Sequence, residues 1–202
     1  MPEQFHIKIK GGEIRIWEVT ETEQELINQI NLTPDEFIRV KNMKNESARL
    51  SFLTIRNMHK KSGFGRIQYN ENGKPFCSGG FISISHSGHI NTILHHTLGE
   101  QGIDIEKIQP RILKIKSRFL GEEEELICEN NLVKYTLCWS AKEAVFKKFG
   151  KETVYFRENQ KILEIDENNK QIIMKITAYK KQTIVHLGYF YPNKDYVLVY
   201  TL

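Results

Sequence analysis

The chain of 202 residues is 40% hydrophobic and 27% charged, which is typical of a globular protein and excludes a disordered or fibrous one. No apolar run approaches the roughly 18 residues that a membrane span needs, and the first residues lack the pattern of a signal peptide. The three cysteines lack metal-site spacing, so we expect reduced thiols in a cytoplasmic protein that binds no membrane; they are Cys77, Cys128 and Cys138.

The formal net charge of +4 is too small to indicate a nucleic-acid-binding protein. The basic residues nevertheless gather in two zones, residues 39–74 and 107–118, and the second of these contains no acidic residue. Two such zones indicate either two anionic partners or one long anionic partner. The alternative is that both zones are simply basic surfaces exposed to solvent. No nucleic-acid motif accompanies them, so we do not expect nucleic acid to be the partner.

The first half of the chain predicts a mixture of strands and helices. Alternating apolar residues indicate two short strands within residues 5–19, around the turn Gly11-Gly12. A helix should follow, capped by Thr20 or Thr22, and another with Thr33 as its cap and Pro34 at its first position. We expect a longer helix over 45–60, a turn over 70–75, and a strand pair over 79–98 with a break at Gly88.

After Gly99 the pattern starts again. The sequence predicts a strand over 102–106, a helix over 110–127 that is interrupted near Gly121, and a long helix over 132–149. From residue 153 to the end we expect strands, with turns at 167–169 and 192–194. The fold class that follows is α+β, in two subdomains of residues 1–98 and 99–202.

Two carboxylates lie on the predicted strand over 102–106. Because side chains alternate along a strand, Asp104 and Glu106 share one face. Neighbouring carboxylates repel each other unless a cation lies between them, and Mg²⁺ prefers oxygen ligands. The strand either presents an acidic outer face to solvent or supplies ligands for a metal ion.

The long helix carries a third carboxylate. Trp139, Glu143 and Lys147 lie at i, i+4 and i+8, so they share one stripe of the helix, with Lys142 beside them. The stripe is either an amphipathic surface with an ion pair or the remainder of a metal site, with Glu143 as a third ligand and the lysines facing the phosphates that the metal holds.

Two segments of the first half could bind an anion. In the turn before Pro75, the proline restricts Lys74 to an extended conformation and so directs its side chain. The strand that ends in Ser85-His86-Ser87 would present hydroxyl and imidazole donors at its tip. Either segment could also be plain surface. A Ser–His catalytic pair is a poor alternative there, because neighbouring strand residues point apart and cannot hydrogen-bond as nucleophile and base.

In this order, the motifs resemble the 4′-phosphopantetheinyl transferase superfamily, of the surfactin-synthetase-activating type. The resemblance rests on four short segments in residues 73–147, and more loosely on Arg49 and Arg56 upstream. The segments are Gly73-Lys74-Pro75, Ser85-His86-Ser87, Gly102-Ile-Asp104-Ile-Glu106 and Trp139-x-x-Lys142-Glu143-Ala144 with Lys147. The family fold implies two similar α/β subdomains related by a pseudo-twofold axis, with coenzyme A in the cleft between them.

The resemblance implies transfer of the phosphopantetheine arm of coenzyme A to a serine of an acyl or peptidyl carrier protein, with release of 3′,5′-ADP. It implies Mg²⁺ as the metal, held by Asp104, Glu106 and Glu143, with Glu143 also acting as the base. Lys142 and Lys147 would stabilise the phosphoryl oxygens. The coenzyme A phosphates would be bound by Arg49, Arg56, Lys74, Pro75, Ser85 and His86.

The second basic zone would then bind the acidic carrier protein. On a helix, Arg111, Lys114 and Arg118 lie at i, i+3 and i+7 and would form one docking face, unless they are merely solvated. A chain with both halves could work as a monomer. Two other functions remain open: a Mg²⁺-dependent phosphodiesterase or nucleotide hydrolase using the same carboxylates, and a non-catalytic module that binds coenzyme A.

Overall fold

The computed structural model describes residues 3–178 and 180–202. The first two residues of the segment that lacks a signal-peptide pattern, Met1 and Pro2, lie outside the described residues. The chain forms two compact units, Met1–Glu100 and Gln101–Leu202. Each contains helices and an antiparallel sheet, so the expected α+β class is confirmed. No helix within the described ranges combines the length and the hydropathy that crossing a bilayer requires.

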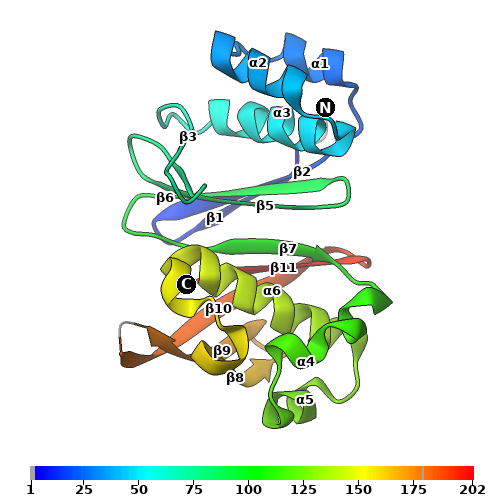
Figure 1. Cartoon of the computed structure of the whole chain (residues 1–202), viewed down its shortest axis with the longest axis vertical. Helices are drawn as coiled ribbons and strands as arrows, with labels where there is room; N and C mark the ends of the chain where they lie inside the picture. Colours follow the sequence, from blue (N-terminus) through cyan, green and yellow to red (C-terminus); the bar gives the residue numbers. More distant parts are fainter. Residues whose placement is uncertain (1–2, 179) are drawn as a thin grey trace. The chain divides into compact units, whose positions relative to one another are not determined.

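The first unit is built on a four-stranded sheet with the strand order β1-β2-β6-β5 (Figure 1). Its hairpins join neighbouring strands antiparallel, as the alternating sequence predicted. Gly11 and Gly88 have positive φ angles of 76° and 58° at the two tight turns, a backbone conformation that favours glycine. The strands are β1 (Glu3–Ile9), β2 (Gly12–Glu18), β5 (Phe81–Ser87) and β6 (Ile90–His96).

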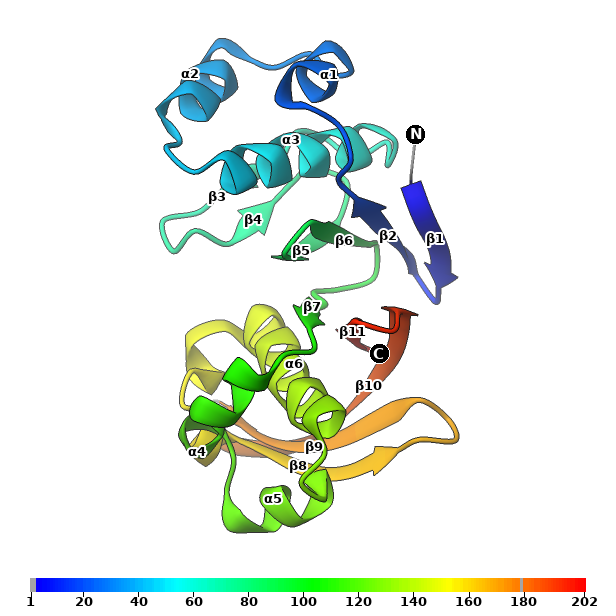
Figure 2. The same ribbon diagram turned by 90° about the vertical axis from the view of Figure 1, so that its right-hand side faces the viewer.

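Three helices cover one face of this sheet, α1 (Glu23–Asn28), α2 (Pro34–Asn42) and α3 (Glu46–Lys60). Figure 2 shows α3 next to the sheet, with α1 and α2 on its other side. Thr22 and Thr33 cap α1 and α2, and each forms a capping box with the glutamate three residues later. The predicted cap at Thr33 is therefore confirmed, and of Thr20 and Thr22 the structure selects Thr22.

The predicted turn over residues 70–75 connects two very short strands, β3 (Gln68–Tyr69) and β4 (Pro75–Phe76). The side chain of Asn70 accepts hydrogen bonds from the backbone N–H groups of Asn72 and Lys74, which closes the turn. The core between α3 and the sheet contains Trp17, Ile55, Met58, Ile82 and Ile93.

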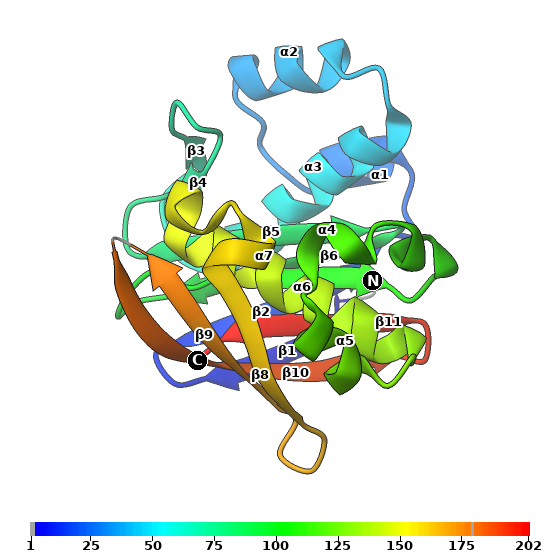
Figure 3. The same cartoon turned by 60° about the horizontal axis from the view of Figure 1, so that its bottom comes forward.

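The second unit has a five-stranded antiparallel sheet with the order β7-β11-β10-β9-β8. Figure 3 shows its long hairpins and the chain entering β8 from α7 (Phe156–Asn159). The strands are β7 (Ile103–Lys107), β8 (Gln160–Asp166), β9 (Gln171–Ala178), β10 (Lys181–Asn193) and β11 (Tyr196–Thr201).

The expectation of strands from residue 153 is wrong for the first part of that segment. A 3₁₀ helix, η2 (Gly150–Thr153), and then α7 precede β8. The ammonium group of Lys142 accounts for this path, because it donates to the carbonyl oxygens of both Phe156 and Gln160 and so holds the chain curled around it.

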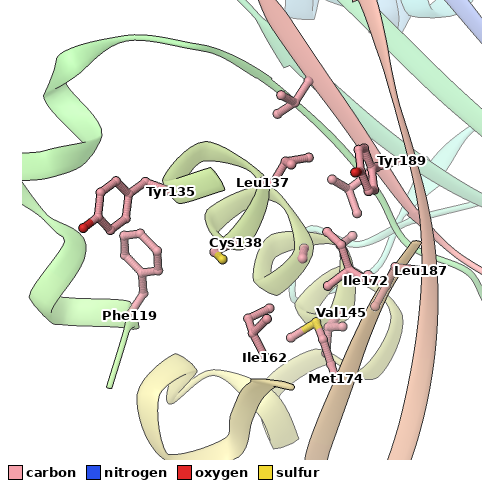
Figure 4. Packing of buried hydrophobic residues seen from close by; sticks show 14 of the residues in the cluster. Phe119, Tyr135, Leu137, Cys138, Val145, Ile162, Ile172, Met174, Leu187 and Tyr189 are labelled. Carbon is pink, nitrogen blue, oxygen red and sulfur yellow. The ribbon is translucent and has the colours of Figure 1, made fainter. Parts of the chain in front are cut away.

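Helix α6 (Leu132–Phe149) has the bounds that the sequence predicted and begins at the cap Asn131, whose side chain accepts from the N–H groups of Val133 and Lys134. One face packs into the largest hydrophobic core of this unit (Figure 4). There, side chains of α6 meet those of β8, β9 and β10; they include Leu137, Cys138, Val145, Ile162, Ile172, Met174 and Leu187.

The helix predicted over 110–127 is instead three short pieces: η1 (Pro110–Lys114), α4 (Lys116–Phe119) and α5 (Glu122–Cys128). The expected break near Gly121 is present, but a second one lies at Ile115. Pro110 opens a 3₁₀ turn, which Ile115 closes. The prediction that Arg111, Lys114 and Arg118 share one α-helical face is therefore wrong, because Arg118 lies on a separate helix.

An ion pair inside the second unit connects these short helices to α6 and the sheet. Lys142 is fully buried, and its Nζ lies 2.7 Å from Glu124 Oε1. Glu124 also accepts hydrogen bonds from the backbone N–H groups of Gly121 and Ile162. Burial lowers the pKa of Lys142, while the adjacent Glu124 carboxylate opposes this change. Glu124 therefore connects α5, α6 and β8 at one point.

We expect Glu124→Gln to lower the free energy of unfolding by about 3–5 kcal/mol, because it leaves the Lys142 charge buried without its counter-ion. Glu123→Gln is the matched control: Glu123 is the neighbouring residue, and it is exposed and pairs with the partly exposed Lys161. Urea unfolding at neutral pH measures both variants. Equal stability of the two would contradict a structural role for the buried pair.

Candidate active site

Strand β7 and helix α6 approach each other very closely at Gly102. A Cβ atom on Gly102 would lie 1.8 Å from the carbonyl oxygen of Ala144, so no other residue fits there without moving the backbone. Gly102 also bonds to Thr201 of β11, the strand next to β7. Its N–H group donates to the side-chain oxygen of Thr201, and its carbonyl oxygen accepts from the N–H group of Thr201. This packing places the side chains of β7 within reach of those on α6.

Asp104 is the most buried of the three predicted metal-ligand carboxylates, at 4% exposure. Its Oδ2 accepts a hydrogen bond from Ser140 Oγ at 2.6 Å, and its Oδ1 lies 2.8 Å from Lys147 Nζ. Lys147 donates in addition to the carbonyl oxygen of Ile103. Both oxygens of the carboxylate are thus held by side chains of α6.

Glu106, two residues along the same strand, is held by the indole of Trp139. Trp139 Nε1 donates to Glu106 Oε1 at 3.2 Å. The ring packs edge-on against Phe119 and also contacts Phe156, which fix its position. Trp139 therefore belongs to the apolar packing and also contacts Glu106.

Glu143 is the third carboxylate, and its environment disfavours its charged form. Burial raises the pKa of Glu143 to about 7, and the charges of Asp104 and Glu106 contribute to the increase, while the ammonium group of Lys147 opposes it. The three carboxylates therefore interact electrostatically. Asp104 and Glu106 of β7 and Lys147 of α6 all lie close enough to Glu143 to affect its pKa, and their role as one metal site stays a prediction.

The chemistry of this donor set suits Mg²⁺, because three carboxylates supply hard oxygen ligands. A cation would also relieve the mutual repulsion that adds to the effect of burial on the pKa of Glu143. Within residues 3–178 and 180–202, no three or more His, Cys, Asp or Glu side chains already have the arrangement of a metal-binding group. Ser140, Lys147 and Trp139 instead donate to Asp104 and Glu106. The residues thus fit the ion by chemistry and charge.

Lys142 does not join this cluster, although it neighbours Glu143 in sequence. Its Nζ lies in the core, bonded to Glu124 and to the carbonyl oxygens of Phe119, Phe156 and Gln160. The predicted role of Lys142 at phosphoryl oxygens is corrected accordingly: neighbouring side chains on a helix point about 100° apart, so Lys142 can point into the core while Glu143 lies near the strand carboxylates.

In the first unit, the two arginines predicted to bind phosphate already have acidic partners. Arg49 pairs with Glu23 at 2.7 Å and donates to the carbonyl oxygen of Met43. Arg56 pairs with Glu36 at 2.6 Å. Its Nη1 is buried and has no hydrogen-bond partner in the described part of the chain.

The other predicted phosphate ligands lie on or beside strands of the first unit. Lys74 precedes β4, which begins at Pro75, and its Nζ lies 2.6 Å from Glu100. On β5, Ser85 is buried and His86 is exposed, in agreement with the predicted alternation of the two faces.

A pocket of about 350 Å³ in the second unit adjoins the acidic cluster. Glu106 and Trp139 form one part of it, and Ile112 and Ile115 supply apolar surface. Two of the three predicted docking residues, Arg111 and Lys114, also line it, whereas Arg118 does not.

Sequence reasoning missed Ser140, the donor to Asp104. The signal was present, because Ser140, Glu143 and Lys147 lie at i, i+3 and i+7 and so share a helical face. A serine carries no charge and is common on helices, so the pattern of charged residues did not single it out.

The pKa of Glu143 predicts how stability depends on pH in the absence of metal. Its pKa is raised from 4.5 to about 7, so the folded protein binds the proton more tightly, and stability falls as pH rises from 4.5 through 7. Glu143→Gln should remove this loss and be more stable than the unmodified protein at pH 8, by at most about 3 kcal/mol. Thermal unfolding between pH 5 and 8 in EDTA measures the difference. A constant difference across this range would contradict the raised pKa.

A model of the 4′-phosphopantetheinyl transferase superfamily matches residues 100–201, just over half of the chain and nearly all of the second unit. The matched segment contains β7 and α6. Two curated relatives are "4′-phosphopantetheinyl transferase AcpT" of Salmonella typhi and of Salmonella typhimurium (strain LT2).

Each of these relatives is 37% identical to the chain over 92 residues, which cover 41% of this chain and 48% of the relative. The match thus spans about half the length of the curated relatives. The surfactin-synthetase-activating subtype stays a prediction. From the extent of the family match, together with the grouping of the motif residues on β7 and α6, the chain belongs to the 4′-phosphopantetheinyl transferase superfamily.

Proposed function

We propose that the protein transfers the 4′-phosphopantetheine arm of coenzyme A to a serine of a carrier protein and releases 3′,5′-ADP. Support comes above all from the acidic cluster of Asp104, Glu106 and Glu143, in which donors on α6 hold both strand carboxylates. The cluster lies within the segment that matches the superfamily. The names of the two Salmonella relatives agree with this reaction class.

Asp104, Glu106 and Glu143 would hold Mg²⁺. The bound ion would neutralise the pyrophosphate charge and the charge that develops on the leaving group. The serine oxygen forms a bond to the phosphorus that carries the pantetheine arm, and the bond from this phosphorus to the bridging oxygen breaks. Glu143 would accept the proton of the serine hydroxyl, directly or through a water.

Lys147 would have an electrostatic part in this reaction. Its ammonium group lies beside Asp104 and is partly exposed, so it can approach a phosphate oxygen while it remains near the carboxylates. Lys142, whose ammonium is buried among core carbonyl groups, keeps only the structural role described above.

The coenzyme A phosphates would be bound by Arg49, Arg56, Lys74, Pro75, Ser85 and His86 of the first unit. Arg56 has the most direct support, because its Nη1 is a buried donor without a hydrogen-bond partner among the described residues. Glu23 and Glu36 orient the two arginines, and a phosphate group would add to these contacts.

The carrier protein would dock at the pocket beside Glu106. Arg111 and Lys114 are exposed at this pocket and would attract acidic side chains, while Ile112 and Ile115 would receive an apolar one. The magnesium requirement, the acidic character of the carrier, the monomeric state and the cytoplasmic location stay predictions.

The experiment that tests the reaction is the incubation of the protein with Mg²⁺, coenzyme A and an apo carrier protein, followed by the intact mass of the carrier. Addition of one phosphopantetheine group, absent with EDTA, supports the proposal. Consumption of coenzyme A with an unmodified carrier would favour the hydrolase. Binding of coenzyme A without any turnover, over a panel of acyl and peptidyl carriers, would favour the non-catalytic module.

We expect Asp104→Asn to reduce turnover by at least 100-fold, because it removes the charge of the most buried ligand while keeping the size of the side chain. Asp166→Asn is the matched control, since Asp166 only stabilises the turn between β8 and β9. Initial rates of carrier modification at saturating coenzyme A measure the effect. Full activity of Asp104→Asn would contradict the assignment of the site.

We expect the double variant Arg111→Glu/Lys114→Glu to raise the KM for an acidic carrier protein about tenfold or more and to leave the KM for coenzyme A unchanged. The same charge reversal at the exposed Lys181, at the start of β10, is the control. An equal increase of both KM values, or none, would contradict docking at this pocket.

A further inference from the structure

The hydroxyl group of Ser140 makes an unusual contact for a residue inside a helix. Buried serine and threonine hydroxyls on helices often donate to the carbonyl oxygen four residues earlier, as Thr136 does to Leu132 on α6 at 2.8 Å. Ser140 is fully buried and donates instead to Asp104 Oδ2 of β7, at 2.6 Å. Its hydrogen bond therefore links the helix to the strand.

The other oxygen of the same carboxylate is held by a residue of the same helix face. Lys147, two helical turns after Ser140, lies 2.8 Å from Asp104 Oδ1. Two donors on one rigid helix thus hold the two oxygens and fix the plane of the carboxylate. Lys147 is one-quarter exposed and can change partner, whereas Ser140 has no access to solvent.

The removal of the hydroxyl would change the orientation of Asp104 more than the packing around it. Each carboxylate oxygen has two lone pairs, so a hydrogen bond from Ser140 leaves Oδ2 with capacity for a cation. Without that bond, the carboxylate would lose the donor that holds Oδ2 and could rotate about its terminal bond. Residues that orient metal ligands typically change metal affinity 10–100-fold when they are replaced.

We propose that Ser140 is a positioning residue that orients Asp104 for cation binding. The proposal deepens the proposed function and rests on it for the identity of the metal ligands. It assigns Ser140 a role that is exerted through Asp104, to which its hydroxyl group donates.

The test is the binding of Mg²⁺ alone, measured by titration calorimetry without coenzyme A or carrier protein. We expect Ser140→Ala to raise the Mg²⁺ dissociation constant tenfold or more, and Ser140→Thr, which keeps the hydroxyl, to stay within about threefold of the unmodified protein. Cys138→Ala is the matched control, because it also removes one heavy atom from a buried side chain of α6, but in the core between α6 and the sheet. It should leave the dissociation constant unchanged.

Thermal unfolding shows whether each variant is folded. If Ser140→Ala does not fold, Ser140→Cys keeps the shape with a much weaker donor and should weaken Mg²⁺ binding as well. A folded Ser140→Ala or Ser140→Cys protein with unchanged Mg²⁺ affinity would overturn the proposal. An equal loss in Cys138→Ala would also overturn it, because the effect would then come from disturbance of the helix.

This experiment can fail independently of the proposed function. Failure of the protein to modify any carrier would leave the effect of Ser140 on Mg²⁺ binding measurable. Conversely, absence of Mg²⁺ binding by the unmodified protein would overturn the role of Ser140, while the transfer reaction could still be observed by the mass of the carrier.

Discussion

The site depends on the close contact between strand β7 and helix α6 at Gly102. The absence of a side chain there allows the strand to run against the backbone of Ala144. At that separation, side chains of Asp104 and Glu106 reach the helix, and Ser140, Lys147 and Trp139 donate hydrogen bonds to them. A larger residue at position 102 would move the strand and break these contacts together, which gives a physical reason for glycine at the start of this motif.

Helix α6 separates two kinds of charged interaction. On one side, Lys142 and Glu124 form a fully buried pair that connects α5 and β8 to the helix. On the other side, Glu143 and Lys147 face the strand carboxylates, where burial and like charge raise the pKa of Glu143. Lys142 and Lys147 thus have the same chemistry but different environments: the first stabilises the fold, and the second remains partly exposed beside the candidate site.

Much of the fold could be predicted because its signals are local. The caps Thr33 and Asn131 begin helices whose hydrogen bonds lie within a few residues, and Gly88 supplies a turn that favours positive φ. The break at Ile115 and the helix before β8 were not predictable in this way. The second depends on Lys142, which binds carbonyl groups of a segment 14–18 residues further along the chain.

In the candidate site, too, the features with local signals could be predicted, whereas those that depend on contacts distant in the sequence could not. Strand and helix periodicity placed Asp104 with Glu106, and Glu143 with Lys147, on the correct faces. Periodicity could not decide between Lys142 as a phosphate ligand and Lys142 as a core residue, because that choice depends on the position of Glu124 in space. Ser140 was missed since an uncharged side chain shows its role only when its acceptor, 36 residues earlier, is known.

The most direct test of the central claim is a crystal structure of the protein grown with Mn²⁺, which replaces Mg²⁺ and gives an anomalous signal. The account predicts one strong anomalous peak within bonding distance of carboxylate oxygens of Asp104, Glu106 and Glu143. A fully occupied Mn²⁺ ion elsewhere in the second unit, with these three side chains left in their present hydrogen bonds, would contradict the claim that they form one metal site.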